Sequence, residues 1–172
     1  MWDDRSYDTP INRRFPEASH IDMPEGVTDI GYLELSNYKK LETVSLPQSL
    51  KTIGYCAFLG CENLKEIHIP DGVTTIYEGA FRYCKSLRAI ELPDSVQDIR
   101  RMIFAGCTSL KKLRMPVSLR SFGRDVLQGC DTLETIELYG ELSEGKPVPE
   151  WLEALVSDKC SSNCEIVMEE GE

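Results

Sequence analysis

The stretch "IPDGVTTIYEGAFRYCKSLRAIEL", residues 69–92, sets the spacing on which most of the chain is built. Its apolar residues recur every 23 positions, in five units from Pro24 to Leu138 without an insertion. The recurring columns are Pro24, Pro47, Pro70, Pro93 and Pro116; Val27, Leu50, Val73, Val96 and Leu119; Ile30, Ile53, Ile76, Ile99 and Phe122; Leu35, Phe58, Phe81, Phe104 and Leu127; and Leu41, Leu64, Leu87, Leu110 and Leu133. Self-similarity at a fixed short period indicates a stack of repeats.

A unit of this length is too short to bury its apolar face alone, so we expect the units to stack and share one continuous core. "LKEIHIP" alternates in the way that is typical of a strand, with Ile67 and Ile69 inward and Glu66 and His68 outward. The proline that follows has no N–H and ends the ladder. "VTTI" suggests a second short extended piece, and "EGAFRYCKSL" a helical turn or 3₁₀ segment that returns the chain. We therefore predict an α/β repeat solenoid whose parallel strands, about 4.8 Å apart, line a concave face.

The same residues carry a family resemblance. A proline, a V/L-x-x-I step, an A-F-x-x-C segment and an L-x-x-I-x-I/L ending, as in "YCAFLGCENLKEIHIP", resemble the BspA-like (Treponema pallidum type) leucine-rich repeat over residues 24–138. The first unit has "YLELSNY" and the last "DVLQGC" in place of A-F-x-x-C, which suits terminal repeats. The resemblance implies a leucine-rich repeat of about five units that serves as a binding scaffold, often on bacterial surfaces. It implies no catalytic residues.

An open solenoid end exposes apolar core and needs a cap. Residues 1–23 are predicted to form an N-terminal cap with a partial repeat, because "HIDMP" keeps the register of "EIHIP", and Trp2, Tyr7 and Phe15 are candidates to close that end. Residues 24–138 hold the five repeats, and residues 139–172 are predicted to form an acidic C-terminal cap. In that cap we expect a helix from near Pro149. Its apolar face would hold Trp151, Leu152, Leu155 and Val156, and "CEIVM" would add a last strand.

The net charge of the 172-residue chain is −10, and twelve acidic residues against two lysines place all of it after Cys130. This balance argues against a general nucleic-acid or anionic-membrane binder, which needs basic surface for phosphate. It is compatible with a basic protein partner. No stretch approaches the roughly 18 apolar residues of a membrane span, so membrane insertion is not expected.

Seven cysteines, an odd number, mildly favour a reducing compartment. Four of them form a column at the 23-residue spacing, Cys61, Cys84, Cys107 and Cys130. Metal ligands usually come in close pairs, so we interpret this column as buried packing thiols. Cys160 and Cys164 are either a local disulfide or two unpaired thiols. No metal, cofactor or catalytic residue is predicted, and the local basic patch of Arg100, Arg101, Arg120 and Arg124 is interpreted as a salt-bridged face.

The outward residues of the repeated strand vary from unit to unit while the core columns do not. Both a plain solvated surface and a recognition surface would show this variation. The predicted protein-binding residues on this surface are Ser45, Glu66, His68, Glu91, Lys112, Arg114 and Glu137.

We therefore expect a non-enzymatic module that binds an unidentified protein partner through the concave sheet. The alternatives are an inhibitor or immunity-type protein that masks a basic enzyme with its acidic C-terminal end, and a structural fragment of a bacterial surface adhesin. "MWDDRSYDTP" has no features of a signal peptide, so the sequence as given predicts a cytoplasmic protein, and a cell-surface or secreted one if a leader was removed.

Overall fold

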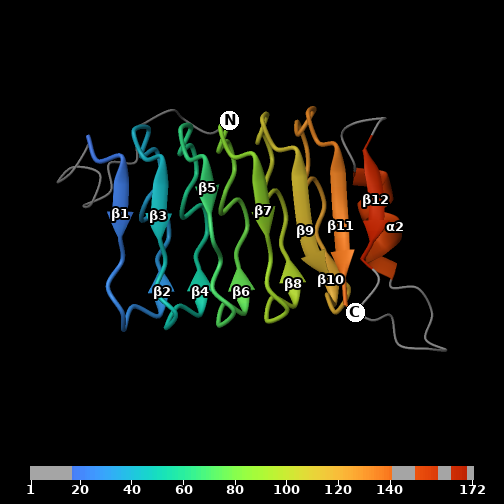
Figure 1. Ribbon diagram of the computed structural model, residues 1–172, viewed down its shortest axis with the longest axis horizontal. Coiled ribbons are helices and arrows are strands. Elements are labelled where there is room, and N and C mark those ends of the chain that lie inside the picture. The colour runs from blue at the N-terminus through green and yellow to red at the C-terminus, as the bar shows by residue number, and fades with distance from the viewer. Residues whose placement is uncertain (1–16, 141–149, 159–163, 170–172) are drawn as a thin grey trace.

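The computed structural model describes residues 17–140, 150–158 and 164–169, and its turns stack side by side along the long axis of the molecule (Figure 1). Each turn contributes two short strands that run in opposite directions. The first strands are β1 (His20–Asp22), β3 (Thr43–Ser45), β5 (Glu66–Ile67), β7 (Ala89–Glu91), β9 (Lys112–Pro116), β11 (Thr135–Tyr139) and, after the last turn, β12 (Glu165–Met168). The second strands are β2 (Asp29–Ile30), β4 (Thr52–Ile53), β6 (Thr75–Ile76), β8 (Asp98–Ile99) and β10 (Ser121–Phe122).

All recorded strand pairs are parallel, and within the repeats each pairs equivalent residues of successive units, as Ile53 pairs with Ile76 and Ile76 with Ile99. The second strands form one sheet, ordered β10-β8-β6-β4-β2. The first strands form two, β1-β3-β5 and β12-β11-β9-β7, with no ladder recorded between β5 and β7. The parallel repeat solenoid predicted from the 23-residue spacing is therefore confirmed, and β12 adds the last strand expected from "CEIVM".

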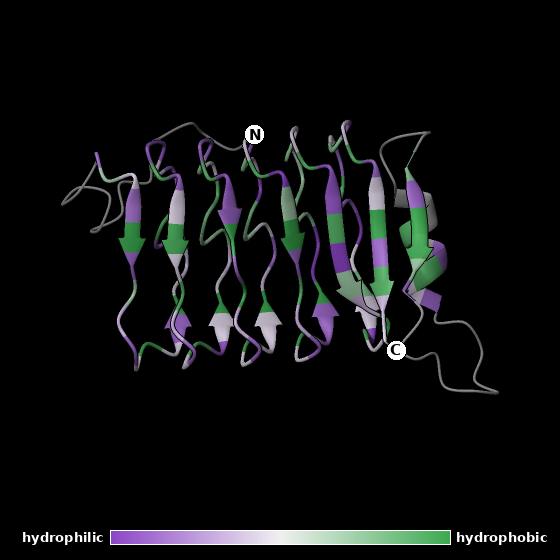
Figure 2. Ribbon diagram, in the orientation of Figure 1, coloured by the Kyte–Doolittle hydropathy of each residue, from purple (hydrophilic) through white to green (hydrophobic). Residues whose placement is uncertain are grey.

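The core lies between the two strand layers and consists of the repeated columns. Hydrophilic and hydrophobic residues alternate along the first strands (Figure 2), so one side of each strand packs inward and the other faces solvent. Within the core, Phe58 stacks on Phe81 with ring centroids 5.3 Å apart, and Phe81 on Phe104 at 5.9 Å. These three side chains are fully buried. The aromatic column thus joins successive turns through direct ring contact.

The segments that return the chain are runs of turns with amide-to-carbonyl bonds three residues apart. Examples are Leu59 N–H to the Cys56 carbonyl at 3.1 Å and Cys61 N–H to the Phe58 carbonyl at 3.2 Å. Two positions per turn have positive φ, and both recur with the period of the repeat. They are Leu33, Cys56, Gly79, Met102 and Asp125, and Asn37, Gly60, Tyr83, Gly106 and Gly129. The predicted 3₁₀-type return therefore has the expected hydrogen bonds, broken twice per turn by left-handed residues.

The cysteine column is buried, as predicted, and it also makes hydrogen bonds. Each thiol donates to a backbone carbonyl of the preceding turn. The pairs are Cys61 to Leu35 at 3.0 Å, Cys84 to Phe58 at 3.3 Å, Cys107 to Phe81 at 3.1 Å and Cys130 to Phe104 at 3.1 Å. Cys56, Cys61, Cys84 and Cys107 are free thiols. Cys160 lies outside the described residues, so the predicted alternatives for its pairing with Cys164 stay open.

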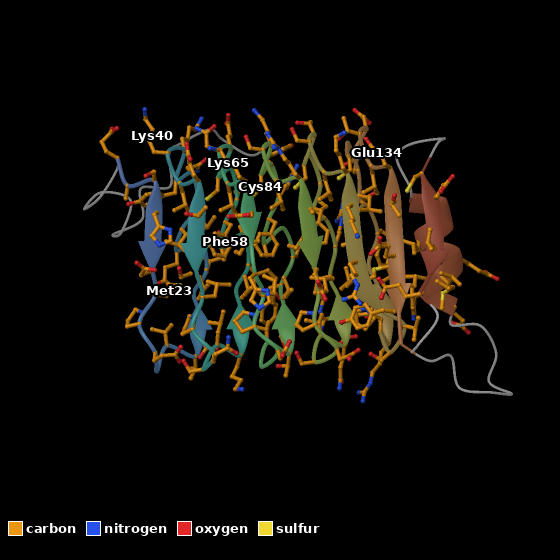
Figure 3. All side chains as sticks on the ribbon, in the orientation of Figure 1. Met23, Lys40, Phe58, Lys65, Cys84 and Glu134 are labelled. Carbon is orange, nitrogen blue, oxygen red and sulfur yellow. The ribbon has the colours of Figure 1, made fainter. Side chains whose placement is uncertain are left out.

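The edge formed by the return turns carries ion pairs between neighbouring turns. Lys65 bonds Glu42 at 2.6 Å and Lys111 bonds Glu134 at 2.8 Å, in each case from one unit to the equivalent segment of the next. Figure 3 shows Lys40, Lys65 and Glu134 along this edge, with Phe58 in the body of the molecule. Because these pairs are exposed, we expect each to stabilise the stack by at most about 1 kcal/mol.

The C-terminal end is covered by α2 (Glu150–Asp158), which begins next to Pro149 as expected and packs near β10. Trp151 and Leu155 are buried and Leu152 is partly buried against the core, in agreement with the predicted apolar face. The side chain of Val156 and residues 1–16, with Trp2, Tyr7 and Phe15, lie outside the described residues, so the domain boundaries stay predictions. No helix in the described ranges is long and apolar enough to cross a membrane.

Candidate functional site

The seven predicted binding residues all belong to the first strands or directly follow one. Ser45 ends β3, Glu66 begins β5 and His68 follows it, and all three are exposed. The other four lie on β7, β9 and β11, and the strand register places Glu91, Arg114 and Glu137 next to one another in a row. We call the outward side of these strands, with β1 and β12, the first-strand face.

Arg114 is the centre of an ion-pair network on this face. Its guanidinium donates one hydrogen bond to Glu91 and two to Glu169. The two bonds to the Glu169 carboxylate oxygens measure 3.1 Å from Nε and 2.6 Å from Nη2. Glu137 lies 3.9 Å from the same Nε and bonds Lys112 at 2.7 Å. The hydrogen bonds that Arg114 donates to Glu169 raise the pKa of Arg114 and lower the pKa of Glu169. Four of the predicted residues are therefore partners of one another.

Tyr139 extends this network across two strands. The Arg114 guanidinium lies 4.1 Å from the centre of its ring, and its hydroxyl donates to the Leu92 carbonyl at 2.7 Å. Burial, followed by the carboxylates of Asp94 and Glu91, raises the pKa of Tyr139 to about 12. The ring is thus fixed from two sides, and its hydroxyl stays protonated as a donor.

A hollow of about 410 Å³ opens beside Tyr139, where the first-strand layer has no ladder between β5 and β7. We call it the acidic hollow; its lining is His68, Ile69, Asp71, Glu91, Pro93, Asp94, Ser95 and Tyr139. Three of these residues carry carboxylates, and among the described residues the one cation bonded to any of them is Arg114, on Glu91. The hollow therefore offers a negative site to a cationic group.

The N-terminal end of the face is also internally bonded. The ring of His20 bonds Thr43 through Nδ1 at 2.6 Å and Asp22 through Nε2 at 2.9 Å, and the Ser45 hydroxyl lies 3.5 Å from the same Nε2. The hydrogen bond with His20 is the main cause that lowers the pKa of Asp22. Within the described ranges, no group of three or more His, Cys, Asp or Glu residues has a geometry that could hold a metal ion.

Two important residues of this face were absent from the sequence-based prediction. Tyr139 stands where the repeat would place a sixth proline, one full unit after Pro116, and that break in the proline column was a readable signal. Glu169 gave no such signal, because β12 pairs Thr135 with Glu165, which lie further apart in the chain than one repeat. Its contact with Arg114 could be found only from the structure.

The comparisons agree with this architecture. The family model described as "BspA type Leucine rich repeat region" matches residues 28–145 in six copies. The structure is similar to the crystal structure of the T. pallidum leucine-rich repeat protein, with a TM-score of 0.68 and 28% identity over 88% of this chain and 73% of that one.

It is also similar to a leucine-rich cell surface protein of Faecalibacterium prausnitzii A2-165, with a TM-score of 0.67 and 29% identity over 74% of this chain but 34% of that one. The pneumococcal vaccine antigen PcpA shares the fold, with a TM-score of 0.70 at 21% identity over 90% of this chain and 42% of the antigen. No match was found among curated proteins. Repeat proteins of this kind are commonly non-enzymatic surface proteins that mediate protein interactions. On the six matched repeats and the fold, this chain belongs to the BspA type leucine-rich repeat family.

Proposed function

We propose that this protein is a non-enzymatic protein-binding module whose acidic hollow receives a basic side chain of a protein partner. The observation that carries the proposal is the hollow itself, in which Asp71, Glu91 and Asp94 share one cation among the described residues. A lysine or arginine of a partner would supply the missing positive charge, and charge-assisted hydrogen bonds of that kind are among the stronger ones. The family's common role in protein interactions supports the proposal.

The predicted residues take two different roles in this proposal. His68 lines the hollow and Glu66 lies two residues before it on β5; both side chains are exposed, and we propose that both contact the partner. Lys112 and Glu137 belong to the Arg114 network. We propose that this network fixes the ring of Tyr139, which forms one wall of the hollow. Since fixed side chains lose little conformational entropy on binding, this wall favours affinity.

We further propose that the protein acts at the cell surface. The support is the Faecalibacterium relative, which is named a cell surface protein and is 29% identical over 74% of this chain. Fractionation with an antibody against the chain tests this, and recovery only in the cytoplasmic fraction would reject it.

The binding proposal is tested by affinity capture with immobilised protein and its Asp94→Lys variant. Asp131→Lys is the matched control, because it makes the same charge change at an exposed turn residue outside the hollow. We expect Asp94→Lys to reduce the recovered partner by about tenfold or more, and Asp131→Lys to leave it within about twofold. Equal recovery by all three proteins would remove the hollow from the binding site.

The same capture distinguishes the alternative in which the acidic C-terminal end masks a basic enzyme. That alternative rests on the ten net negative charges after Cys130. If that alternative holds, a Glu165→Lys variant, changed at an exposed residue of β12, should no longer capture the partner, whereas Asp94→Lys should capture it as the unmodified protein does.

A further inference from the structure

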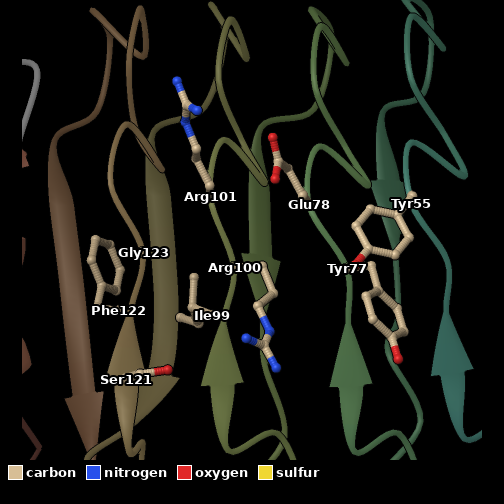
Figure 4. A pocket seen from close by; sticks show the side chains of 9 residues that line it. All are labelled: Tyr55, Tyr77, Glu78, Ile99, Arg100, Arg101, Ser121, Phe122 and Gly123. Carbon is tan, nitrogen blue, oxygen red and sulfur yellow. The ribbon is translucent and has the colours of Figure 1, made fainter.

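The opposite side of the molecule carries a second hollow of different chemistry. It has a volume of about 430 Å³ and lies over the second strands and the residues that directly follow them (Figure 4). We call it the basic groove; its lining is Tyr55, Tyr77, Glu78, Ile99, Arg100, Arg101, Ser121, Phe122 and Gly123. These residues come from four successive turns, so the groove runs about 14 Å along the stack at a strand spacing of about 4.8 Å.

The floor of the groove is open because the position that follows each second strand holds a large side chain in the two middle turns and glycine in the turn on either side. Tyr77 and Arg100 stand at this position in the two middle turns, and Gly54 and Gly123 in the turns that flank them. A Cβ on Gly123 would lie 2.7 Å from the backbone carbon of Arg100, and one on Gly54 would lie 2.5 Å from the Ile30 carbonyl oxygen. Both flanking turns therefore require glycine, and the side chains of Tyr77 and Arg100 rise beside bare backbone.

One end of the groove is aromatic. The rings of Tyr55 and Tyr77 lie with centroids 4.5 Å apart at an angle of 31°, and Tyr55 is 49% exposed. A tyrosine pair of this kind presents an amphipathic surface with few rotatable bonds, which is the usual character of an interface hot spot.

The other end of the groove carries the cationic side chains of Arg100 and Arg101. Among the described residues, Arg100, Arg120 and Arg124 have no ion-pair partner, and they lie in the two turns that carry β8 and β10. Arg101 pairs with Asp125 at 3.4 Å. Every other described arginine and lysine except Lys51, Arg82 and Arg88 bonds a carboxylate. Within the described ranges, the salt-bridged face expected from the sequence is therefore found at Arg101 alone, and Arg100 is the lining cation without a carboxylate partner.

Glu78 is the one carboxylate in the lining, and its position restricts where an anion fits. Figure 4 shows Glu78 and Arg101 directed to one side of the groove and Arg100 to the other, between the tyrosine pair and Phe122. An anion next to Arg100 therefore avoids Glu78, whereas a continuous polyanion along the groove meets it. This arrangement favours a ligand with local negative charge over a nucleic-acid backbone.

We propose that the basic groove binds a short acidic segment of a protein partner, with a carboxylate on Arg100 and an apolar or planar side chain against Tyr55 and Tyr77. The length of the groove matches four or five residues of an extended chain at about 3.3 Å each. Charge complementarity identifies the occupant, because three of the five described arginines without an ion pair among the described residues, Arg100, Arg120 and Arg124, lie in the two adjacent turns that carry β8 and β10. The groove lies on the side away from the acidic hollow, so the two sites can be tested separately.

The test uses a rhodamine-labelled peptide, Gly-Phe-Glu-Asp-Glu-Gly, and its amide analogue, Gly-Phe-Gln-Asn-Gln-Gly, titrated with the full chain by fluorescence anisotropy. We expect the acidic peptide to bind about tenfold or more tightly than the analogue, with an affinity that falls as salt rises. Arg100→Glu should weaken the acidic peptide by about tenfold or more, and Tyr77→Ala by a few-fold at every salt concentration.

Arg88→Glu is the matched control. It makes the same charge change at an exposed arginine that has no ion pair among the described residues and does not line the groove. We expect it to leave the affinity within about twofold. Circular dichroism of each variant shows that the fold is kept, and if Arg100→Glu does not fold, Arg100→Gln takes its place.

Four results would overturn the proposal. The first is equal binding of the two peptides, and the second is equal loss of binding in Arg100→Glu and Arg88→Glu. The third is displacement of the peptide by a single-stranded hexanucleotide at the same or a lower concentration, which would make the groove a phosphate site. Self-association of the free chain that Arg100→Glu abolishes would instead identify a second copy as the occupant, and it would likewise reject the partner segment.

Discussion

The thiol of Cys84 donates a hydrogen bond of 3.3 Å to the backbone carbonyl of Phe58, one turn earlier in the stack. The same carbonyl accepts the N–H of Cys61, the residue that precedes Cys84 in the thiol column, at 3.2 Å. Each cysteine of the column thus links its own return turn to the preceding one. The position requires a small side chain that packs as a hydrophobe and still donates, and cysteine satisfies both requirements.

We predict that Cys84→Ala lowers the free energy of unfolding by about 1–2 kcal/mol, because it leaves a small void and removes one bond from the carbonyl. Cys84→Ser keeps a donor and should be less destabilising than Cys84→Ala. Urea unfolding followed by circular dichroism measures both variants. A Cys84→Val variant as stable as the wild type would show that packing alone accounts for the column.

The column thiols should resist alkylation in the folded protein. Burial raises the pKa of Cys61 and Cys107 to about 12, and that of Cys84 well above its ordinary value, so almost no thiolate is present near neutral pH. We predict that iodoacetamide at about pH 8 labels these three only after unfolding. Cys56, which is partly exposed, is the internal reference. Peptide mapping by mass spectrometry gives the rates, and equal rates for Cys84 and Cys56 would contradict the prediction.

The sequence predicted the core of this fold because the core is periodic. Ile53, Ile76 and Ile99 recur once per repeat and pair with one another across successive turns, so the spacing alone determined the register of the second strands. The outward direction of His68 followed in the same way from strand alternation. Because each repeat unit packs on a similar neighbouring unit, the sequence pattern of one unit also predicts the contacts between units.

The contacts that define the two candidate sites could not be predicted in this way, because they depend on departures from the period. Glu169 reaches Arg114 only because β12 pairs at a different spacing from the repeats. Likewise, the sequence groups Arg100 with Arg101, but their side chains point to opposite sides of the groove and only one finds a carboxylate among the described residues. Which charges neutralise one another depends on side-chain direction across neighbouring turns.

Gly106 tests the left-handed positions of the return turns. It has a φ of +75°, and a Cβ there would overlap the ring of Tyr83 in the preceding turn. Gly129, with a φ of +74°, is the matched control, because its nearest neighbour, the Gly106 Cα, would lie 3.6 Å from a new Cβ. We predict that Gly129→Ala costs about 1 kcal/mol of stability from backbone strain, and that Gly106→Ala costs about 2–4 kcal/mol because overlap adds to strain.

A double variant, Gly106→Ala with Tyr83→Ala, separates the two causes. Since the ring is then absent, the additional cost of the alanine at position 106 should fall to the value measured for Gly129→Ala. Urea unfolding of Gly129→Ala, Gly106→Ala, Tyr83→Ala and the double variant gives these differences in the free energy of unfolding. An unchanged cost in the Tyr83→Ala background would mean that strain, and not overlap, dominates at Gly106.

The contact between Arg114 and Glu169 makes the attachment of β12 depend on pH. The bonds from Arg114 hold the pKa of Glu169 below its ordinary value of 4.5, so the folded state favours the charged carboxylate. The stabilisation is therefore complete above pH 4.5 and is lost as the pH falls through the lowered pKa of the folded state. We predict that the protection of the β12 amides against hydrogen exchange decreases over this acidic range while that of β6 stays constant. In Glu169→Gln the protection of β12 should be lower at neutral pH and should change less on acidification. A Glu169→Gln variant that keeps the full acid-dependent loss would show that the loss does not come from the contact between Arg114 and Glu169.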